Sequence, residues 1–215
     1  TLRLFNGGLI STSTSGSTGK AGIVTVNTGR LEMNHSEISS SADLLSTGQT
    51  GSINIRAEND IRLSNDAKIS VKNAATTTNS KTATGNININ LSDNSVLYLD
   101  NSSVSTVSNI GDSGSITING SNAVYLHNSP IITSVLGQSG DGGDINITSN
   151  ALIMDTGFIQ ANTQAEKASG GKIAISEPTM IIPSGNFLVI GGSQEDFTPF
   201  SGRNVIQAVA PNGQS

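Results

Sequence analysis

Short runs of alternating apolar and polar residues recur along the chain, and each run follows a glycine. Residues 114–118, Gly-Ser-Ile-Thr-Ile, are typical of them. Apolar β-branched residues at every second position predict a strand that buries one face. The pattern begins at six glycines that lie 28 to 34 residues apart: Gly22, Gly51, Gly85, Gly114, Gly143 and Gly171.

Each copy continues with a second alternating pair and then with a single apolar residue, the third-strand anchor. A truncated copy precedes the six and contains Leu2, Leu4 and the anchor Leu9. The second pairs are Leu31/Met33, Ile61/Leu63, Leu97/Leu99, Val124/Leu126, Leu152/Met154 and Met180/Ile182, and the anchors are Ile38, Ile69, Val104, Ile131, Ile159 and Phe187.

A repeat of fixed length indicates a solenoid, in which each unit buries its apolar face against its neighbours. Three short strands per unit, without helical periodicity, predict one coil of a parallel β-helix. We therefore expect an all-β protein, a β-solenoid of about seven coils. Residues 1–188 would form the repeats, and residues 189–215 an irregular loop or flap followed by a return to the next coil.

The position two residues after each second pair favours a tight corner. Asparagine is frequent there, and it tolerates the left-handed backbone that such a corner needs. Stacked asparagines could also form a ladder of amide hydrogen bonds. The corner residues are Asn6, His35, Asn65, Asn101, Asn128, Thr156 and Ser184, and the loops, expected along one edge, are 39–50, 73–84, 105–113, 133–142 and 160–170.

The residues between the members of the second pairs should point outward and stack. This column contains a surface charge ladder, an aromatic stack of Tyr98 on Tyr125, and an apolar stripe of Ile153 and Ile181. The aromatic stack has a structural interpretation and a sugar-binding one, and the structural one is favoured. The whole column reads Arg3, Glu32, Arg62, Tyr98, Tyr125, Ile153 and Ile181.

An exposed apolar stripe usually has a cover. Residues 189–206 contain Phe197 and Phe200 and follow directly in sequence. We predict that this segment folds back so that a phenylalanine packs on Ile153 or Ile181. The alternative is a stripe open to a partner. The candidate interaction surface therefore comprises Tyr98, Tyr125, Ile153, Ile181, Phe197 and Phe200.

A polar column beside this surface is the best candidate for chemistry. Asp100, His127 and Asp155 should lie on successive coils, close enough to influence one another. Because corner positions favour Asp for backbone reasons, we expect no catalytic residue and no metal ligand here. The column reads Phe5, Asn34, Ser64, Asp100, His127, Asp155 and Pro183.

Composition narrows the function classes. Apolar residues make up 34% and aromatic residues 3%, as suits a thin rod filled by Ile, Val and Leu. A net charge of −5 provides no basic stripe for nucleic acid. There is no cysteine for a disulfide or thiolate site, and no apolar run approaches the ~20 residues of a membrane-spanning helix. No cofactor is expected.

The Gly-Ser-Ile-Asn-Ile and Gly-Ser-Ile-Thr-Ile openings, the Asn-Ser turns and the C-terminal Asn-Val-Ile-Gln-Ala-Val-Ala-Pro-Asn-Gly-Gln-Ser resemble the filamentous haemagglutinin-like repeats of bacterial two-partner-secretion exoproteins. This resemblance implies a right-handed β-helix, a segment of a longer filament, exported through an outer-membrane partner to the cell surface of a Gram-negative-type bacterium.

We accordingly expect a non-enzymatic stalk or adhesin segment that attaches the cell to other cells or surfaces through an unidentified receptor, for which a glycan is one candidate. The alternative is a carbohydrate-binding or carbohydrate-cleaving β-helix module. An enzyme should bring outward carboxylates or basic residues together on one face, whereas the 16 acidic residues are scattered over different copies.

Overall fold

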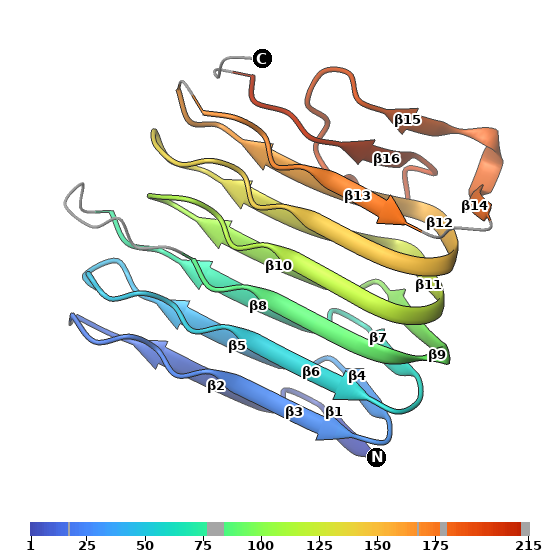
Figure 1. Cartoon of the computed structure of the whole chain (residues 1–215), viewed down its shortest axis with the longest axis horizontal. Coiled ribbons are helices and arrows are strands. Elements are labelled where there is room, and N and C mark those ends of the chain that lie inside the picture. Colours follow the sequence, from blue (N-terminus) through green and yellow to red (C-terminus); the bar gives the residue numbers. More distant parts are fainter. Residues whose placement is uncertain (17, 77–83, 167, 177–179, 212–215) are drawn as a thin grey trace.

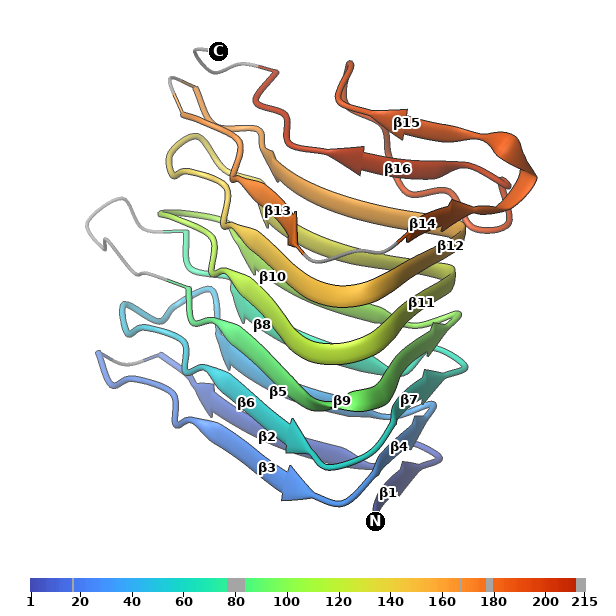
Figure 2. The ribbon, with the colours of Figure 1, turned by 45° about the vertical axis from the view of Figure 1, so that its right-hand side comes forward.

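The chain winds into a parallel β-solenoid of about six turns, with the N-terminus at one end of the stack and the C-terminal strands at the other (Figures 1 and 2). The computed structural model describes residues 1–16, 18–76, 84–166, 168–176 and 180–211. The all-β, parallel β-helix prediction is confirmed. Among the described residues, none forms a helix with the length and hydrophobicity that crossing a membrane requires.

Three strips of parallel strands make up the stack. The Gly-led strip comprises β3 (Val24–Thr28), β6 (Ile53–Ala57), β9 (Ile87–Asp100), β11 (Ile116–Val135), β12 (Ile145–Thr163) and β13 (Ile173–Ser176). The second strip comprises β1 (Leu2–Phe5), β4 (Leu31–Asn34), β7 (Ile61–Ser64), parts of β9, β11 and β12, and β14 (Met180–Pro183). The third comprises β2 (Leu9–Thr14), β5 (Glu37–Ala42), β8 (Lys68–Asn73), β10 (Ser103–Ser108), parts of β11 and β12, β16 (Asn204–Gln207) and β15 (Leu188–Ile190).

Some of the strands expected as separate elements are continuous. β9 covers the first two strands of its coil, and β11 and β12 cover all three. The bend between the first two is absorbed by a shift of register between Ile118 and Ser121, where β11 pairs with β12. Loops emerge along one edge of the stack, as predicted (Figure 1). Residues 77–83 of the longest loop lie outside the described residues.

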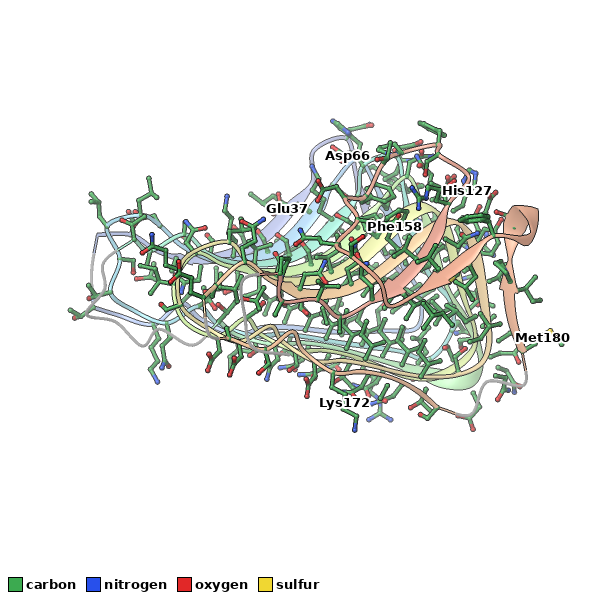
Figure 3. The ribbon with its side chains drawn as sticks, turned by 90° about the horizontal axis from the view of Figure 1, so that it is seen from above. Glu37, Asp66, His127, Phe158, Lys172 and Met180 are labelled. Atoms are coloured by element: carbon green, nitrogen blue, oxygen red, sulfur yellow. The ribbon has the colours of Figure 1, made fainter. Side chains whose placement is uncertain are left out.

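The predicted apolar positions fill the interior. Ile53, Ile87, Ile116 and Ile145 stack in register and are completely buried, and the second pairs of the same coils are buried beside them. Figure 3 looks along the stack and shows side chains filling the space between two long sides, with Phe158 on one side and Lys172 on the other. Each coil therefore buries its apolar face against its neighbours.

From Gly51 onward, the glycine that opens a coil is required by the close approach of the neighbouring coil's backbone. A Cβ built on Gly114 would lie 1.9 Å from the carbonyl oxygen of Gly85, and one on Gly143 would lie 2.1 Å from that of Gly114. Real Cβ atoms do not come so close to a carbonyl oxygen. A buried hydroxyl of the third strand also binds here, since Thr106 Oγ1 donates to the carbonyl oxygen of Gly114 at 2.5 Å.

The predicted corner residues adopt the left-handed backbone. Their φ angles lie between 46° and 56° in the first six coils: Asn6, His35, Asn65, Asn101, Asn128 and Thr156. The seventh predicted corner residue, Ser184, has no such angle. Gly185 has it instead, with φ 64°. This displacement by one residue is the first sign of a shifted register in the last coil.

The predicted register of the last coil is wrong by one residue. β14 pairs with β12 so that Ile181 lies opposite Leu152 and Ile182 lies opposite Ile153. Ile182, and not Ile181, therefore continues the outward column. Pro183 lies opposite Met154, so Pro183 does not extend the polar column. Three consecutive apolar residues, Met180 to Ile182, satisfy either phase, and the sequence pattern could not choose between them.

Two predicted anchors are also wrong. Leu9 lies opposite Glu37 and is exposed, whereas Ile10 lies opposite Ile38 and takes the inward position. Phe187 is exposed as well. The inward position after Ile159 belongs to Ile206 in β16, a strand from further along the chain.

The last coil exchanges the order of its strands. β16 pairs with β12 on one side and with β15 on the other, so the later strand lies between the coil below and the earlier strand. After β15 the chain must therefore return toward the stack before it enters β16 (Figure 2). The returning residues, 191–203, form a flap on the outside of the third strip.

Candidate functional site

Outward columns of the second strip form the predicted stacks. Tyr98 and Tyr125 stack with ring centroids 4.9 Å apart and ring planes 6° from parallel. Burial raises the pKa of the Tyr98 hydroxyl, with further contributions from the negative charges of Asp100 and Tyr125. In the charge ladder, Arg3 Nε lies 2.8 Å from Glu32 Oε2, but Arg62 is paired with an aspartate of its own coil.

The predicted polar column is a chain of side-chain contacts. His127 Nδ1 lies 2.7 Å from Asp100 Oδ1, and His127 Nε2 lies 3.6 Å from Asp155 Oδ2. Ser184 occupies the place predicted for Pro183 and donates its hydroxyl to Asp155 Oδ1 at 2.8 Å. Four side chains on four successive coils are thus linked along the corner.

This arrangement lacks the contact of a Ser–His nucleophile. The hydroxyl of Ser184 is bound to Asp155, and both ring nitrogens of His127 face carboxylates, so the histidine is not placed to take a proton from the serine. Within the described part of the chain, no three His, Cys, Asp or Glu side chains are gathered in a way that could hold a metal ion. The column links successive coils through polar side-chain contacts.

The predicted flap exists, but it covers a different surface. Phe197 packs edge-on against Phe158 of the third strip, with ring centroids 5.1 Å apart. The prediction that a phenylalanine packs on Ile153 or Ile181 is wrong, because those residues lie on the second strip, on the other side of the corner at Thr156. The flap leads into β16, which lies on the third strip, and it is held to that strip.

Two stacked glutamines on neighbouring strands fasten the flap. Gln160 Nε2 donates to the carbonyl oxygen of Glu195 at 2.5 Å and to Gln207 Oε1 at 2.9 Å. The backbone amide of Glu195 donates to the same Gln207 oxygen at 2.8 Å, and Gln207 Nε2 donates to the carbonyl oxygen of Ser193 at 2.8 Å. Both glutamine side chains point outward from their strands yet are buried, because the flap lies over them.

The tip of the flap is bound to the asparagine corner. Asn128 Nδ2 donates to Asn101 Oδ1 at 2.5 Å, which realises the predicted amide ladder between these two coils. The ladder ends on the flap, since the backbone amide of Phe200 donates to Asn128 Oδ1 at 2.6 Å. Gly202 is attached one coil further along, through a hydrogen bond from its amide to Thr156 Oγ1.

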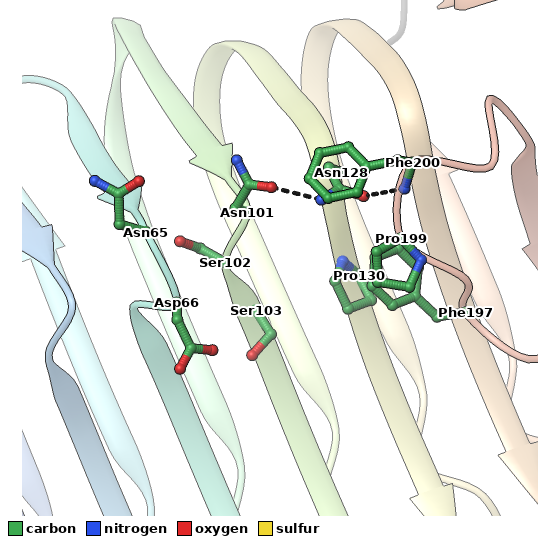
Figure 4. Close-up of a pocket in the computed structure, with 10 residues that line it drawn as sticks. All are labelled: Asn65, Asp66, Asn101, Ser102, Ser103, Asn128, Pro130, Phe197, Pro199 and Phe200. Carbon is green, nitrogen blue, oxygen red and sulfur yellow. Dashed lines mark hydrogen bonds between the residues drawn. The ribbon is translucent and has the colours of Figure 1, made fainter.

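A groove of about 550 Å³ separates this tip from the corner between β7 and β8, four coils below the flap's own strand β16. Figure 4 shows Asn65 and Asp66 on one side and Phe200 on the other, with Asn101 between them. The aromatic and proline rings form one wall and the polar side chains form the floor and the far side. The lining residues are Asn65, Asp66, Asn101, Ser102, Ser103, Asn128, Pro130, Phe197, Pro199 and Phe200.

The structure divides the predicted interaction surface in two. Tyr98, Tyr125 and Ile153 lie on the second strip, with Ile182 as the neighbour of Ile153 in place of Ile181. Phe197 and Phe200 line the groove on the far side of the corner. Sequence reasoning treated Asn65, Asn101 and Asn128 only as corner residues. Their shared position was visible in the sequence, but the flap that turns the corner into a groove was not.

We compared the chain with models of protein families, with curated proteins and with solved structures, and none of them matches it.

Proposed function

We propose that this chain is a segment of a surface-exposed filament that attaches a bacterial cell to other cells or surfaces. The observation that carries the proposal is the open stack. Inward-facing apolar side chains are incompletely covered at both of its ends: Leu2, Leu4 and Ile10 in the first coil, and Ile181 and Ile190 in the last. Unpaired strand edges with apolar side chains accept further coils of the same kind.

The shape of the stack supports a role in attachment. A parallel solenoid extends by about 4.8 Å for each added coil, and it presents each outward column as a continuous surface along its length. The ladders of Tyr98 and Tyr125, and of Asn101 and Asn128, show how identical or similar side chains repeat along this surface. Such a rod projects a binding site away from the cell and offers large lateral surfaces.

Export through an outer-membrane partner belongs to the same proposal. It rests on the resemblance of the Gly-Ser-Ile repeats and Asn-Ser turns to two-partner-secretion exoproteins. The absence of cysteine agrees with a chain that crosses the envelope unfolded and then winds coil by coil, because no thiol has to be kept reduced on the way.

Antibodies raised against residues 1–215 test the proposal on the organism that encodes the chain. Intact, unpermeabilised cells should be stained, and deletion of the gene should reduce attachment to the surfaces on which the organism grows. Staining that needs permeabilisation, or attachment unchanged by the deletion, would contradict the proposal.

A further inference from the structure

The groove between the asparagine corner and the flap has one apolar wall and one polar side. Phe200, Pro199 and Pro130 contribute rings, and Asn65, Asp66 and Ser103 contribute amide, carboxylate and hydroxyl groups (Figure 4). A sugar ring has the same division, because its C–H face is apolar and its rim carries hydroxyls. We propose that this groove binds a neutral glycan. The inference rests on the proposed attachment function and names the chemical class of its receptor.

Some polar side chains of the groove are hydrogen-bonded within the protein, and others are available to a ligand. Asn101 and Asn128 bind each other, and Asn128 also accepts the amide of Phe200, so these two asparagines hold the site together. Asn65 occupies the same corner position one coil away from Asn101. The side chains of Asn65 and Ser103 make no hydrogen bond to any residue that the structure describes. They are therefore available to sugar hydroxyls.

The aromatic platform is held in an unfavourable backbone conformation. Phe200 has φ 57°, a region that bulky residues rarely adopt, and its side chain is 75% exposed. Its amide is bound by Asn128, and Gly202 is bound by Thr156, so two corner residues hold the tip of the flap in place. The exposed ring of Phe200 gains nothing from burial, and backbone strain of this kind clusters at active sites, ligand-binding sites and switch regions.

The charge of the groove selects among glycans. Among the lining residues that the structure describes, only Asp66 is ionisable. Its side chain is 64% exposed, and Lys68 Nζ lies 3.1 Å from one of its carboxylate oxygens. A sulfated or carboxylated sugar would meet this carboxylate, whereas Lys68, the cation paired with it, is not one of the residues that line the groove. A neutral sugar can instead donate its hydroxyls to Asp66 and stack its apolar face on the ring of Phe200.

The dimensions suit a short oligosaccharide. Asn65 and Asn128 occupy the same corner position two coils apart, which corresponds to about 10 Å at the strand spacing. The flap closes one end of this interval, and the lower coils leave the other end open. A chain of one or two sugar rings fits between them, and a longer glycan would continue along the corner toward His35.

Saturation-transfer NMR with the 215-residue chain tests the inference. The probes are the methyl glycosides of glucose, galactose and mannose, together with lactose, maltose and cellobiose. We expect saturable binding of at least one probe, with shifts of the Asn65 side-chain amide resonances. Phe200→Ala and Asn65→Gly, of which the second keeps the left-handed backbone, should each weaken it about tenfold or more, equivalent to about 1.4 kcal/mol.

Phe5→Ala is the matched control, because Phe5 is an exposed phenylalanine remote from the groove, and its removal should leave binding unchanged. Thermal unfolding confirms that each variant is folded, and Asn65→Gly serves alone if Phe200→Ala is not. Chondroitin sulfate disaccharides serve as charged comparison probes. Absence of saturable binding, binding that both groove variants retain, or binding only of these charged probes would overturn the inference. Surface staining and attachment by the intact organism would be unaffected by these outcomes, so failure of the groove is distinguishable from failure of the attachment function.

Discussion

Gly114 lies at a position where the neighbouring coil leaves no room for a Cβ atom. Its replacement by alanine would place a Cβ 1.9 Å from the Gly85 carbonyl oxygen, so the two coils would have to separate locally. We expect Gly114→Ala to lower the free energy of unfolding by about 1–3 kcal/mol or more, as other overpacked sites do. Gly29→Ala is the control, because the nearest atom to its added Cβ is 3.9 Å away. Denaturant unfolding should separate the two variants, and equal losses would refute the close-approach argument.

Ile116 and the following residue test which side chains are inside. Ile116 is completely buried, whereas Thr117 points outward and is only half-buried. Ile116→Asn should cost about 3–5 kcal/mol, because lost packing and an unpaired buried amide add together. Thr117→Asn should be nearly neutral, since asparagine already occupies this outward position in both neighbouring coils. A similar fall in melting temperature for both variants would mean that the register is wrong.

The ionisation of Tyr98 should make the stability of the tyrosine stack depend on pH. Burial and the charge of Asp100 raise the pKa of its hydroxyl above the usual 10.0, so the folded state favours the neutral phenol. The corresponding stabilisation is present below pH 10 and is lost as the pH rises through the raised pKa. Phenolate absorbance should therefore show one tyrosine titrating late, and Asp100→Asn should bring its pKa down. Titration of Tyr98 at or below its usual pKa would contradict this account.

The flap has one phenylalanine that packs on the solenoid and another that is exposed at its tip, so separate substitutions can test the two roles. Phe197 is half-buried against Phe158, whereas the ring of Phe200 projects into water. We expect Phe197→Ala to destabilise the last coils by about 1–3 kcal/mol, less than a fully buried phenylalanine would, and to open residues 191–203 to limited proteolysis. Phe200→Ala should change neither measurement appreciably. The reverse order of effects would show that the flap is held by its tip.

Element by element, the sequence is most informative where every coil repeats the same residue. The Gly-led isoleucines and the corner asparagines recur in phase, so strand order, inward face and left-handed corners follow from them. The last coil breaks this rule. Met180, Ile181 and Ile182 are all apolar, so either of two registers satisfies the pattern, and tertiary pairing with β12 selects the one in which Ile182 lies beside Ile153.

The exchange of β15 and β16 lay beyond sequence reasoning for a similar reason. Both segments are short and contain a Val-Ile pair, Val189/Ile190 and Val205/Ile206, so either could pair with β12. The choice depends on the glutamine pair, Gln160 and Gln207, and on the buried Asn204, whose side chain binds the backbone of Gly157 and Phe187. These contacts join residues of neighbouring coils that lie up to 47 positions apart in the sequence. A local sequence pattern therefore cannot predict them.

At the scale of the whole molecule, the groove depends on the solenoid register. Asn65, Asn101 and Asn128 come from three successive coils, and Phe200 reaches them from the last coil. A slip of one residue in any of these coils would turn the asparagine away from the corner and remove the anchor of the flap. The candidate binding site is thus a property of the stacked array, and the register is the claim on which fold and site both rest.

Distances between nitroxide labels test that register most directly. The chain contains no cysteine, so labels can be placed at will, and Thr25, Asn146 and Ala174 belong to one outward column. Pulsed electron spin resonance on Thr25→Cys/Asn146→Cys and on Thr25→Cys/Ala174→Cys should give backbone separations of about 19 Å and about 24 Å, four and five coils at the strand spacing. An increase of about one strand spacing between the pairs would support the account, whereas equal distances, or a shorter distance to Ala174, would contradict it.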